Sequence, residues 1–180
     1  MLLVVDNGSI YTKTLTDFLA EKNISFEIQT PNILDLKSLS KYDSFILSGR
    51  RKNEKKTNEI NSKIINYSIK NNCKLLGICY GAEILALTLG GTIKKSPSLQ
   101  KGNETVKIIK NNFINHESLQ VFESHSFEIS KLPLDLISIG QSKNCRYEII
   151  MHIRKPVFGT QFHPEMSEDG NNLIEKFCLL

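Results

Sequence analysis

The sequence lacks the features that mark several classes of protein. No apolar run approaches the roughly 20 residues of a membrane-spanning helix, and an acidic Asp6 comes too early for a secretory signal. The net charge of +4 is too mild to indicate a nucleic-acid surface. The four cysteines show no Cys-x-x-Cys spacing, and the four histidines do not cluster with them, so we expect no metal site. These absences predict a cytoplasmic protein that binds neither membranes nor nucleic acid.

The first half of the chain alternates strand and helix patterns. Its 180 residues, 40% of them hydrophobic, suit one domain over residues 1–180. Strands are expected at residues 2–5, 24–28, 44–47 and 75–78. Helices are expected at residues 11–21, 57–70 and 82–89, with a connector at 31–39. This alternation predicts an α/β protein with an open, mostly parallel twisted sheet flanked by helices.

Beyond Gly91 the hydrophobic period shortens. Short strands are expected at residues 92–94, 105–109, 119–122, 127–129, 136–139 and 146–152. Pro97, Gly102, Pro133 and Gly140 fall in or near the turns between them. A strand at 157–162 and a helix at 171–179 end the chain. We therefore expect a smaller antiparallel or mixed β section in the C-terminal half.

The segment Gly77-Ile78-Cys79-Tyr80-Gly81 carries one reactive side chain between two glycines. It lies between a predicted strand and a predicted helix, which is the pattern of a nucleophile elbow with Cys in place of Ser. The turn is so tight that side chains at the two glycine positions would collide. The helix N-terminus also favours a thiolate. A buried structural cysteine is the alternative interpretation.

His163 and Glu165 lie just past the last predicted strand, with Pro164 stiffening the chain between them. A thiol nucleophile needs a base to take its proton, and the base needs an acceptor that orients it. Residues far apart in sequence can meet when both follow strands of one parallel sheet. The pattern therefore predicts that His163 and Glu165 serve Cys79.

Together with Gln161-Phe162-His163-Pro164-Glu165, the elbow resembles the class I (triad) glutamine amidotransferases, nearly end to end from residues 4–8 to the last helix. The resemblance implies a glutaminase that passes ammonia from glutamine to a synthase partner. It implies that Cys79 is the nucleophile, His163 the base and Glu165 its orienting acceptor.

The resemblance also implies an oxyanion site, made by the loop at Gly49 and Arg50 and by the N–H of Tyr80. The family usually has a second glycine where this chain has Arg50, which resists a positive φ. The basic segment Arg50–Lys56 is either a solvated loop or a docking surface.

Glu83 stands where the family usually has Gln. A carboxylate there can accept from a ligand's amino group, but it opposes a thiolate on Cys79. Its alternative role is to stabilise the helix N-terminus.

Further substrate-binding candidates are Ser124, His125 and Ser126, since the family presents backbone groups to glutamine in this region; a surface histidine is the equal alternative for His125. Tyr147-Glu148 and the start of the chain are similar to the GMP synthetase branch of the family. In that branch the partner is an ATP-pyrophosphatase-type synthase. The glutaminase half-reaction itself needs no cofactor, and ATP and Mg²⁺ belong to the partner.

Other functions remain open from the sequence. One is an amidotransferase of another pathway, of the anthranilate or aminodeoxychorismate type. A second is a γ-glutamyl hydrolase of the same fold, which would release an amino acid or peptide rather than ammonia alone. A third is a non-catalytic amidotransferase-like module, which the unusual residues at Arg50 and Glu83 favour and the intact triad opposes.

Overall fold

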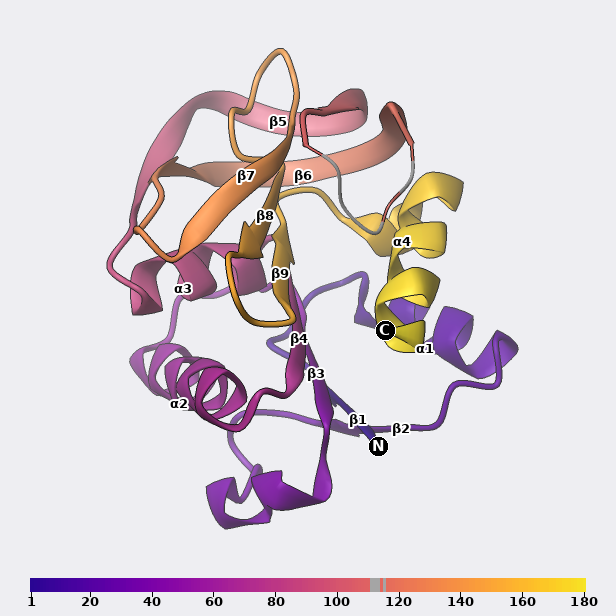
Figure 1. The fold of residues 1–180 in the computed structure, drawn as a ribbon, viewed down its shortest axis with the longest axis vertical. Helices are drawn as coiled ribbons and strands as arrows, with labels where there is room; N and C mark the ends of the chain where they lie inside the picture. Colours follow the sequence, from indigo (N-terminus) through magenta and orange to yellow (C-terminus); the bar gives the residue numbers. More distant parts are fainter. Residues whose placement is uncertain (111–113, 115) are drawn as a thin grey trace.

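One sheet of nine strands organises the computed structural model, which describes residues 1–110, 114 and 116–180 (Figure 1). The strand order is β2-β1-β3-β4-β9-β8-β7-β5-β6. The first five of these strands pair in parallel, and β8, β7, β5 and β6 extend the sheet with antiparallel pairs. The strands are β1 (Leu2–Val5), β2 (Phe26–Gln29), β3 (Ser44–Leu47), β4 (Lys74–Ile78), β5 (Thr92–Ile108), β6 (Ser118–Lys131), β7 (Leu136–Gln141), β8 (Ile149–His152) and β9 (Val157–Thr160).

Helices cover both faces of the sheet. In Figure 1, α1 (Thr12–Glu21) and α4 (Glu168–Leu179) lie on one side, and α2 (Lys55–Asn71) and α3 (Tyr80–Thr88) lie on the other. The buried residues form two matching clusters: Leu15, Leu19 and Phe177 belong to one, and Ile64 and Leu85 to the other. The central strands β1, β3 and β9 are buried along their whole length, as expected for a parallel sheet covered on both sides.

Local sequence explains where the helices start and stop. Ser167 caps α4, because its hydroxyl oxygen accepts a hydrogen bond from the N–H of Gly170. Helix α2 ends at Asn72, which adopts the left-handed conformation that asparagine tolerates well. The connector between β2 and β3 contains a 3₁₀ helix, η1 (Leu36–Lys41), capped by Asp35.

The predicted alternation of strands and helices in the first half is confirmed, with boundaries shifted by a few residues. The strands predicted at residues 2–5 and 44–47 match β1 and β3. Helix α3 starts directly after Cys79, two residues earlier than predicted. Helix α4 starts at Glu168, three residues before the predicted start at 171.

The prediction of separate short strands between residues 92 and 129 was wrong. Residues 92–94 and 105–109 belong mostly to one long strand, β5, and residues 119–122 and 127–129 belong to β6. Pro97 does not end β5, because the register with β6 shifts between Lys95 and Gln100 and this irregularity accommodates a residue without an N–H. Gly102 stays within the strand at a φ of +124°.

Within the described residues, no helix is both long and apolar enough to cross a membrane.

The packing of α4 gives a stability prediction. Phe177 is fully buried, and its ring makes an edge-to-face contact with Phe158, with a centroid distance of 6.2 Å. Phe177→Ala should lower the free energy of unfolding by about 3–5 kcal/mol, because it removes this packing and leaves a cavity. Leu134 is 96% exposed, so Leu134→Ala should change the free energy of unfolding by less than about 0.5 kcal/mol. Urea denaturation of both variants measures the difference; equal effects would show that α4 does not close the core.

Candidate active site

Cys79 lies at the turn between β4 and α3, in a backbone conformation that few residues adopt. Its φ is 51° and its ψ is −105°, outside the regions that non-glycine residues favour. A Cβ added at Gly77 would lie 2.4 Å from the carbonyl of Gly81, and one added at Gly81 would lie 2.3 Å from the carbonyl oxygen of Leu47. The predicted steric need for both glycines is therefore confirmed. Such stored strain is typical of functional sites.

His163 and Glu165 form a buried pair directly after β9. Nδ1 of His163 lies 2.8 Å from Oε1 of Glu165, and the two residues are 3% and 2% exposed. Because a carboxylate only accepts, Nδ1 carries the proton and Nε2 is left as the basic nitrogen. The ring is held in place by an edge-to-face contact with Tyr11, with centroids 4.6 Å apart. A Cβ at Gly49 would lie 2.9 Å from Cε1 of His163, so the loop packs closely on this ring.

The sheet brings Cys79 and the His163–Glu165 pair to neighbouring strand ends. Strands β4 and β9 pair in parallel, with Ile78 opposite Thr160. The N–H of Cys79 donates to the carbonyl of Thr160 at 2.7 Å, three residues before His163. A hydrogen bond from the N–H of His163 to the carbonyl of Phe122 ties the same segment to β6. Thiol and imidazole therefore share one edge of the sheet.

The resting state of Cys79 is a thiol. Burial raises the pKa of this thiol well above its ordinary value, and the nearby Glu83 carboxylate raises it further. The N–H of Tyr80 at the start of α3 lowers the pKa but does not outweigh these two causes. The expectation that the helix N-terminus favours a thiolate is therefore outweighed by desolvation. A base must remove the proton before the sulfur can attack.

A cavity of about 300 Å³ opens beside Cys79 and contains most of the substrate-binding residues predicted from the sequence. It is lined by Arg50, Arg51, Asn53, Cys79, Tyr80, Glu83, Leu99, Ser124, His125, Ser126 and Phe127. Gly49, His163 and Glu165 are not among the lining residues. The cavity therefore places the candidate nucleophile, the candidate ligand residues on β6 and the loop after β3 around one space.

Arg50 is fixed at one side of this cavity by several contacts. Its guanidinium lies 3.9 Å from the ring centroid of Tyr80. Its Nη1 donates to Oδ1 of Asn53 and to Oδ1 of Asn58, each at 2.7 Å. The hydroxyl of Tyr80 donates to the same oxygen of Asn58 at 2.8 Å. The backbone of Arg50 forms an antiparallel bridge with Gly8. Sequence reasoning missed Asn58, because nothing marks this asparagine among the other polar residues of α2.

Glu83 is 5% exposed in the first turn of α3, and its Oε1 accepts a hydrogen bond of 3.3 Å from Nε2 of Gln161. Burial raises the pKa of its carboxyl, while the Gln161 hydrogen bond and the positive charges of Arg50 and His125 oppose the rise. Glu83 therefore lines the cavity with its carboxyl group held by Gln161 and near the positive charges of Arg50 and His125.

Each ring nitrogen of His125 lies close to an oxygen atom. Nδ1 donates to the carbonyl of Phe127 at 2.8 Å, and Nε2 lies 3.0 Å from Oε2 of Glu123, although the angle of this approach is not that of a hydrogen bond. Burial lowers the pKa of His125, but the Glu123 carboxylate and the Phe127 carbonyl outweigh it and raise the value. Contact between its ring nitrogens and a ligand would displace one of these partners.

Sequence reasoning missed Glu123, although the strand pattern held a signal. Leu119, Val121, Glu123 and His125 alternate on the buried face of β6, so an acid stands where a hydrophobic residue is usual. Glu148 is 1% exposed nearby, and burial together with the Glu123 charge raises its pKa to about 9. Glu148 therefore keeps its proton at neutral pH. Among the described residues, no group of three or more His, Cys, Asp or Glu could hold a metal ion.

Comparisons with known proteins agree with this geometry. The family model for "Glutamine amidotransferase class-I" matches residues 3–179. One subunit of the glutamine-hydrolysing GMP synthase of Picrophilus torridus is 29% identical over 98% of this chain and 96% of its own length. The glutamine-hydrolysing GMP synthase of Aliivibrio fischeri is 28% identical over 99% of this chain but 35% of its own length. A crystal structure of a GMP synthase subunit protein from Thermoplasma acidophilum superposes with a TM-score of 0.87 at 28% identity, covering 98% of this chain and 91% of that one.

The raised pKa of Glu148 predicts how stability depends on pH. The carboxyl titrates near its ordinary pKa of 4.5 in the unfolded chain and near 9 in the folded chain. Between these values the folded chain keeps a proton that the unfolded chain has released, so stability falls as pH rises through this window. Glu148→Gln should flatten that fall, and Glu59→Gln, at an exposed position, should not. Thermal melts from pH 5 to pH 9 measure the slopes; parallel slopes for wild type and Glu148→Gln would contradict the buried, protonated carboxyl.

The elbow geometry predicts which cysteine reacts. A chloroketone analogue of glutamine should label Cys79 and spare Cys73, Cys145 and Cys178, because only Cys79 lines the cavity and neighbours a buried histidine–carboxylate pair. Cys79→Ala should abolish labelling and glutamine hydrolysis without unfolding the chain. Peptide mass spectrometry measures the labelled site, and label found mainly on another cysteine would overturn the assignment of the nucleophile.

Proposed function

Because the chain belongs to the class-I glutamine amidotransferase family, we propose that it is the glutaminase subunit of a two-subunit GMP synthase. The observation that carries this proposal is its end-to-end similarity to proteins named as one subunit of a glutamine-hydrolysing GMP synthase, which it matches over almost their whole length. The chain spans about one third of the length of a longer relative that is named as a whole GMP synthase. In this proposal the remaining part, which uses the ammonia, is a separate synthase subunit.

The reaction follows from the residues at the strand ends. The Sγ of Cys79 attacks the side-chain carboxamide carbon of glutamine as Nε2 of His163 takes the thiol proton. His163 gives that proton to the amide nitrogen, the C–N bond breaks, and ammonia leaves. The γ-glutamyl thioester on Cys79 is then cleaved by a water molecule that His163 deprotonates. The products are glutamate and the free thiol.

Glu165 holds His163 in the tautomer that this sequence of steps requires, with Nδ1 protonated and Nε2 basic. The N–H of Tyr80, which acts on the Cys79 sulfur, is the first candidate donor to the oxyanion. The second is a backbone N–H of the loop at Gly49 and Arg50. No step of this half-reaction needs a cofactor, and ATP and Mg²⁺ act on the partner. The proposal places both proteins in the cytoplasm.

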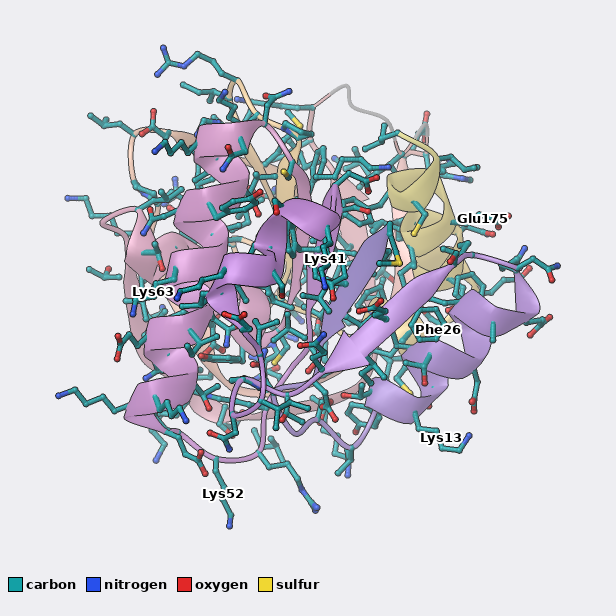
Figure 2. The ribbon with its side chains drawn as sticks, turned by 90° about the horizontal axis from the view of Figure 1, so that it is seen from below. Lys13, Phe26, Lys41, Lys52, Lys63 and Glu175 are labelled. Atoms are coloured by element: carbon teal, nitrogen blue, oxygen red, sulfur yellow. The ribbon has the colours of Figure 1, made fainter. Side chains whose placement is uncertain are left out.

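The loop after β3 is suited to bind the partner and to change conformation when it does. Its continuation, Arg51 to Lys56, is exposed throughout, and Figure 2 shows Lys52 extending away from the body of the protein. Arg50 has a negative φ in this structure, since Asn23, Asn72 and Cys79 are the described non-glycine residues with positive φ. The side-chain contacts of Arg50 and its bridge to Gly8 resist a backbone flip. A partner with acidic groups at its surface would bind Arg51 and Lys52 and favour a different loop state.

This arrangement predicts that the isolated chain is a poor glutaminase and that docking of the synthase partner activates it. Loss of one oxyanion donor typically lowers kcat by a factor of about 100 to 1000, and docking should recover a gain of that order. The measurement is ammonia release from glutamine by the chain alone and with the synthase partner from the same organism, its nucleotide and its acceptor. Full activity of the isolated chain, unchanged by a synthase that demonstrably binds, would contradict activation by the partner. It would favour a free-standing hydrolase.

A further inference from the structure

A chain of hydrogen bonds from α2 holds the loop after β3. It begins at Asn61, which is fully buried on α2. Asn61 and Asn7, in the segment after β1, form a reciprocal amide pair. Nδ2 of Asn61 donates to Oδ1 of Asn7 at 2.7 Å, and Nδ2 of Asn7 donates to Oδ1 of Asn61 at 3.2 Å. Nδ2 of Asn61 also donates to the carbonyl of Thr57 at 2.8 Å, so the pair ties the segment after β1 to the helix.

Asn7 carries this support to the first peptide group of the loop. Its Nδ2 donates to the carbonyl of Ser48 at 2.9 Å, and its backbone N–H donates to Oγ of Ser48 at 2.9 Å. The carbonyl and the N–H of one trans peptide group point in opposite directions. Because Asn7 fixes the carbonyl of Ser48, it also fixes the direction of the N–H of Gly49.

Ser48 extends the support to the second peptide group. Its hydroxyl donates to the carbonyl of Gly49 at 2.9 Å, which fixes the direction of the N–H of Arg50 in the same way. The hydroxyl has a defined orientation, since it accepts one hydrogen bond from Asn7 and donates one to Gly49. One network therefore orients both N–H groups that are candidates for the second oxyanion donor.

These two peptide groups lie beside the proposed base. A Cβ added at Gly49 would lie 2.9 Å from Cε1 of His163. An oxyanion donor is effective only when it is held at hydrogen-bond distance from the place that the oxygen occupies in the transition state. Neither Asn7 nor Asn61 lines the cavity beside Cys79. They can therefore act on the reaction only through the loop that they hold.

A fully buried amide on α2 is itself a sign of a specific role. The other large and fully buried side chains of this helix, Ile64 and Ile65, are apolar. Burying an amide costs free energy unless its donors and acceptor find partners, and the reciprocal pair supplies them to Asn61. Asn58, three positions earlier on the same helix, binds the side chain of Arg50. Helix α2 thus supports both the backbone and a side chain of the loop.

We propose that Asn7 and Asn61 are positioning residues for the oxyanion site. Their amide pair holds the carbonyl of Ser48 and, through the hydroxyl of Ser48, the carbonyl of Gly49. The N–H groups of the loop are thereby aimed before the substrate arrives. This inference rests on the proposed glutaminase function, and it extends the active site to two side chains that do not touch the substrate.

The test compares kcat and KM for glutamine in the complex with the synthase partner. Asn7→Asp keeps the size of the side chain but has no donor for the carbonyl of Ser48, and Asn61→Ala removes the amide that holds Asn7. The double variant completes a cycle. Asn71→Ala is the matched control, because the amide of Asn71 also donates to a carbonyl four residues earlier on α2 but lies at an exposed position.

Asn7→Asp and Asn61→Ala should each lower kcat about 10- to 100-fold, a smaller effect than loss of a whole oxyanion donor, because the N–H groups remain but are no longer held. KM should change by less than about threefold, since neither side chain lines the cavity. The double variant should be no slower than the slower single variant, because both changes act on one carbonyl. Asn71→Ala should keep wild-type kinetics.

Alkylation with iodoacetamide separates this role from general damage to the site. The sulfur of Cys79 bonds to the CH₂ carbon of the reagent, iodide leaves and the thiol proton is removed, so no oxyanion forms. The rate of Cys79 alkylation, followed by peptide mass spectrometry, should therefore stay within about twofold of wild type in both single variants. Thermal melts check that each variant is folded. If Asn61→Ala does not fold, Asn7→Asp still decides, because Asn7 is only half-buried.

Four outcomes would overturn the inference and leave the glutaminase function intact. They are a kcat within about twofold of wild type in Asn7→Asp and Asn61→Ala, losses that multiply in the double variant, a loss that appears in KM alone, and alkylation of Cys79 that slows as much as kcat. If the wild-type complex releases no ammonia from glutamine at all, the proposed function fails, and this inference fails with it.

Discussion

The parallel pairing of β4 with β9 is the constraint on which the rest of the site depends. It sets Ile78 opposite Thr160, so the residues that follow each strand emerge at the same edge of the sheet. Helices α3 and α4 cover opposite faces of the sheet (Figure 1). A shift in this register would separate Cys79 from His163 without changing either local motif. The chemistry is therefore encoded in strand order as much as in the residues.

The strained turn at Cys79 is held by its surroundings rather than by its own preference. A cysteine at positive φ is unfavourable by about 1–3 kcal/mol, and it persists because neighbouring structure allows no alternative. Gly77 and Gly81 let the turn pack within 2.4 Å of positions that side chains would otherwise occupy. The hydrogen bond from Cys79 to Thr160 fixes the turn from the other side. The same contact that locates the thiol thus also supports its conformation.

Much of this arrangement could be predicted from the sequence, because it depends on local patterns. Buried apolar runs identify β1, β3 and β4, and glycines around Cys79 identify the elbow. The long strands β5 and β6 could not be predicted, since Pro97 and Gly102 suggest turns that pairing with β6 overrides. The hydrogen-bond partners of Arg50, Asn53 and Asn58, could not be predicted either, because they resemble the other polar residues around them. Contacts between distant side chains of common types leave no periodic signal.

The charges around the cavity explain why a buried, unreactive thiol suits this site. Glu83 and Glu123 both raise the pKa of the Cys79 thiol, and Glu148 stays protonated beside Glu123. His125 and Arg50 supply the opposing positive charge. A thiolate formed in advance would react with any electrophile that entered. In the proposed mechanism the thiol loses its proton to His163 only when a carboxamide is in place, so it reacts with the bound substrate alone.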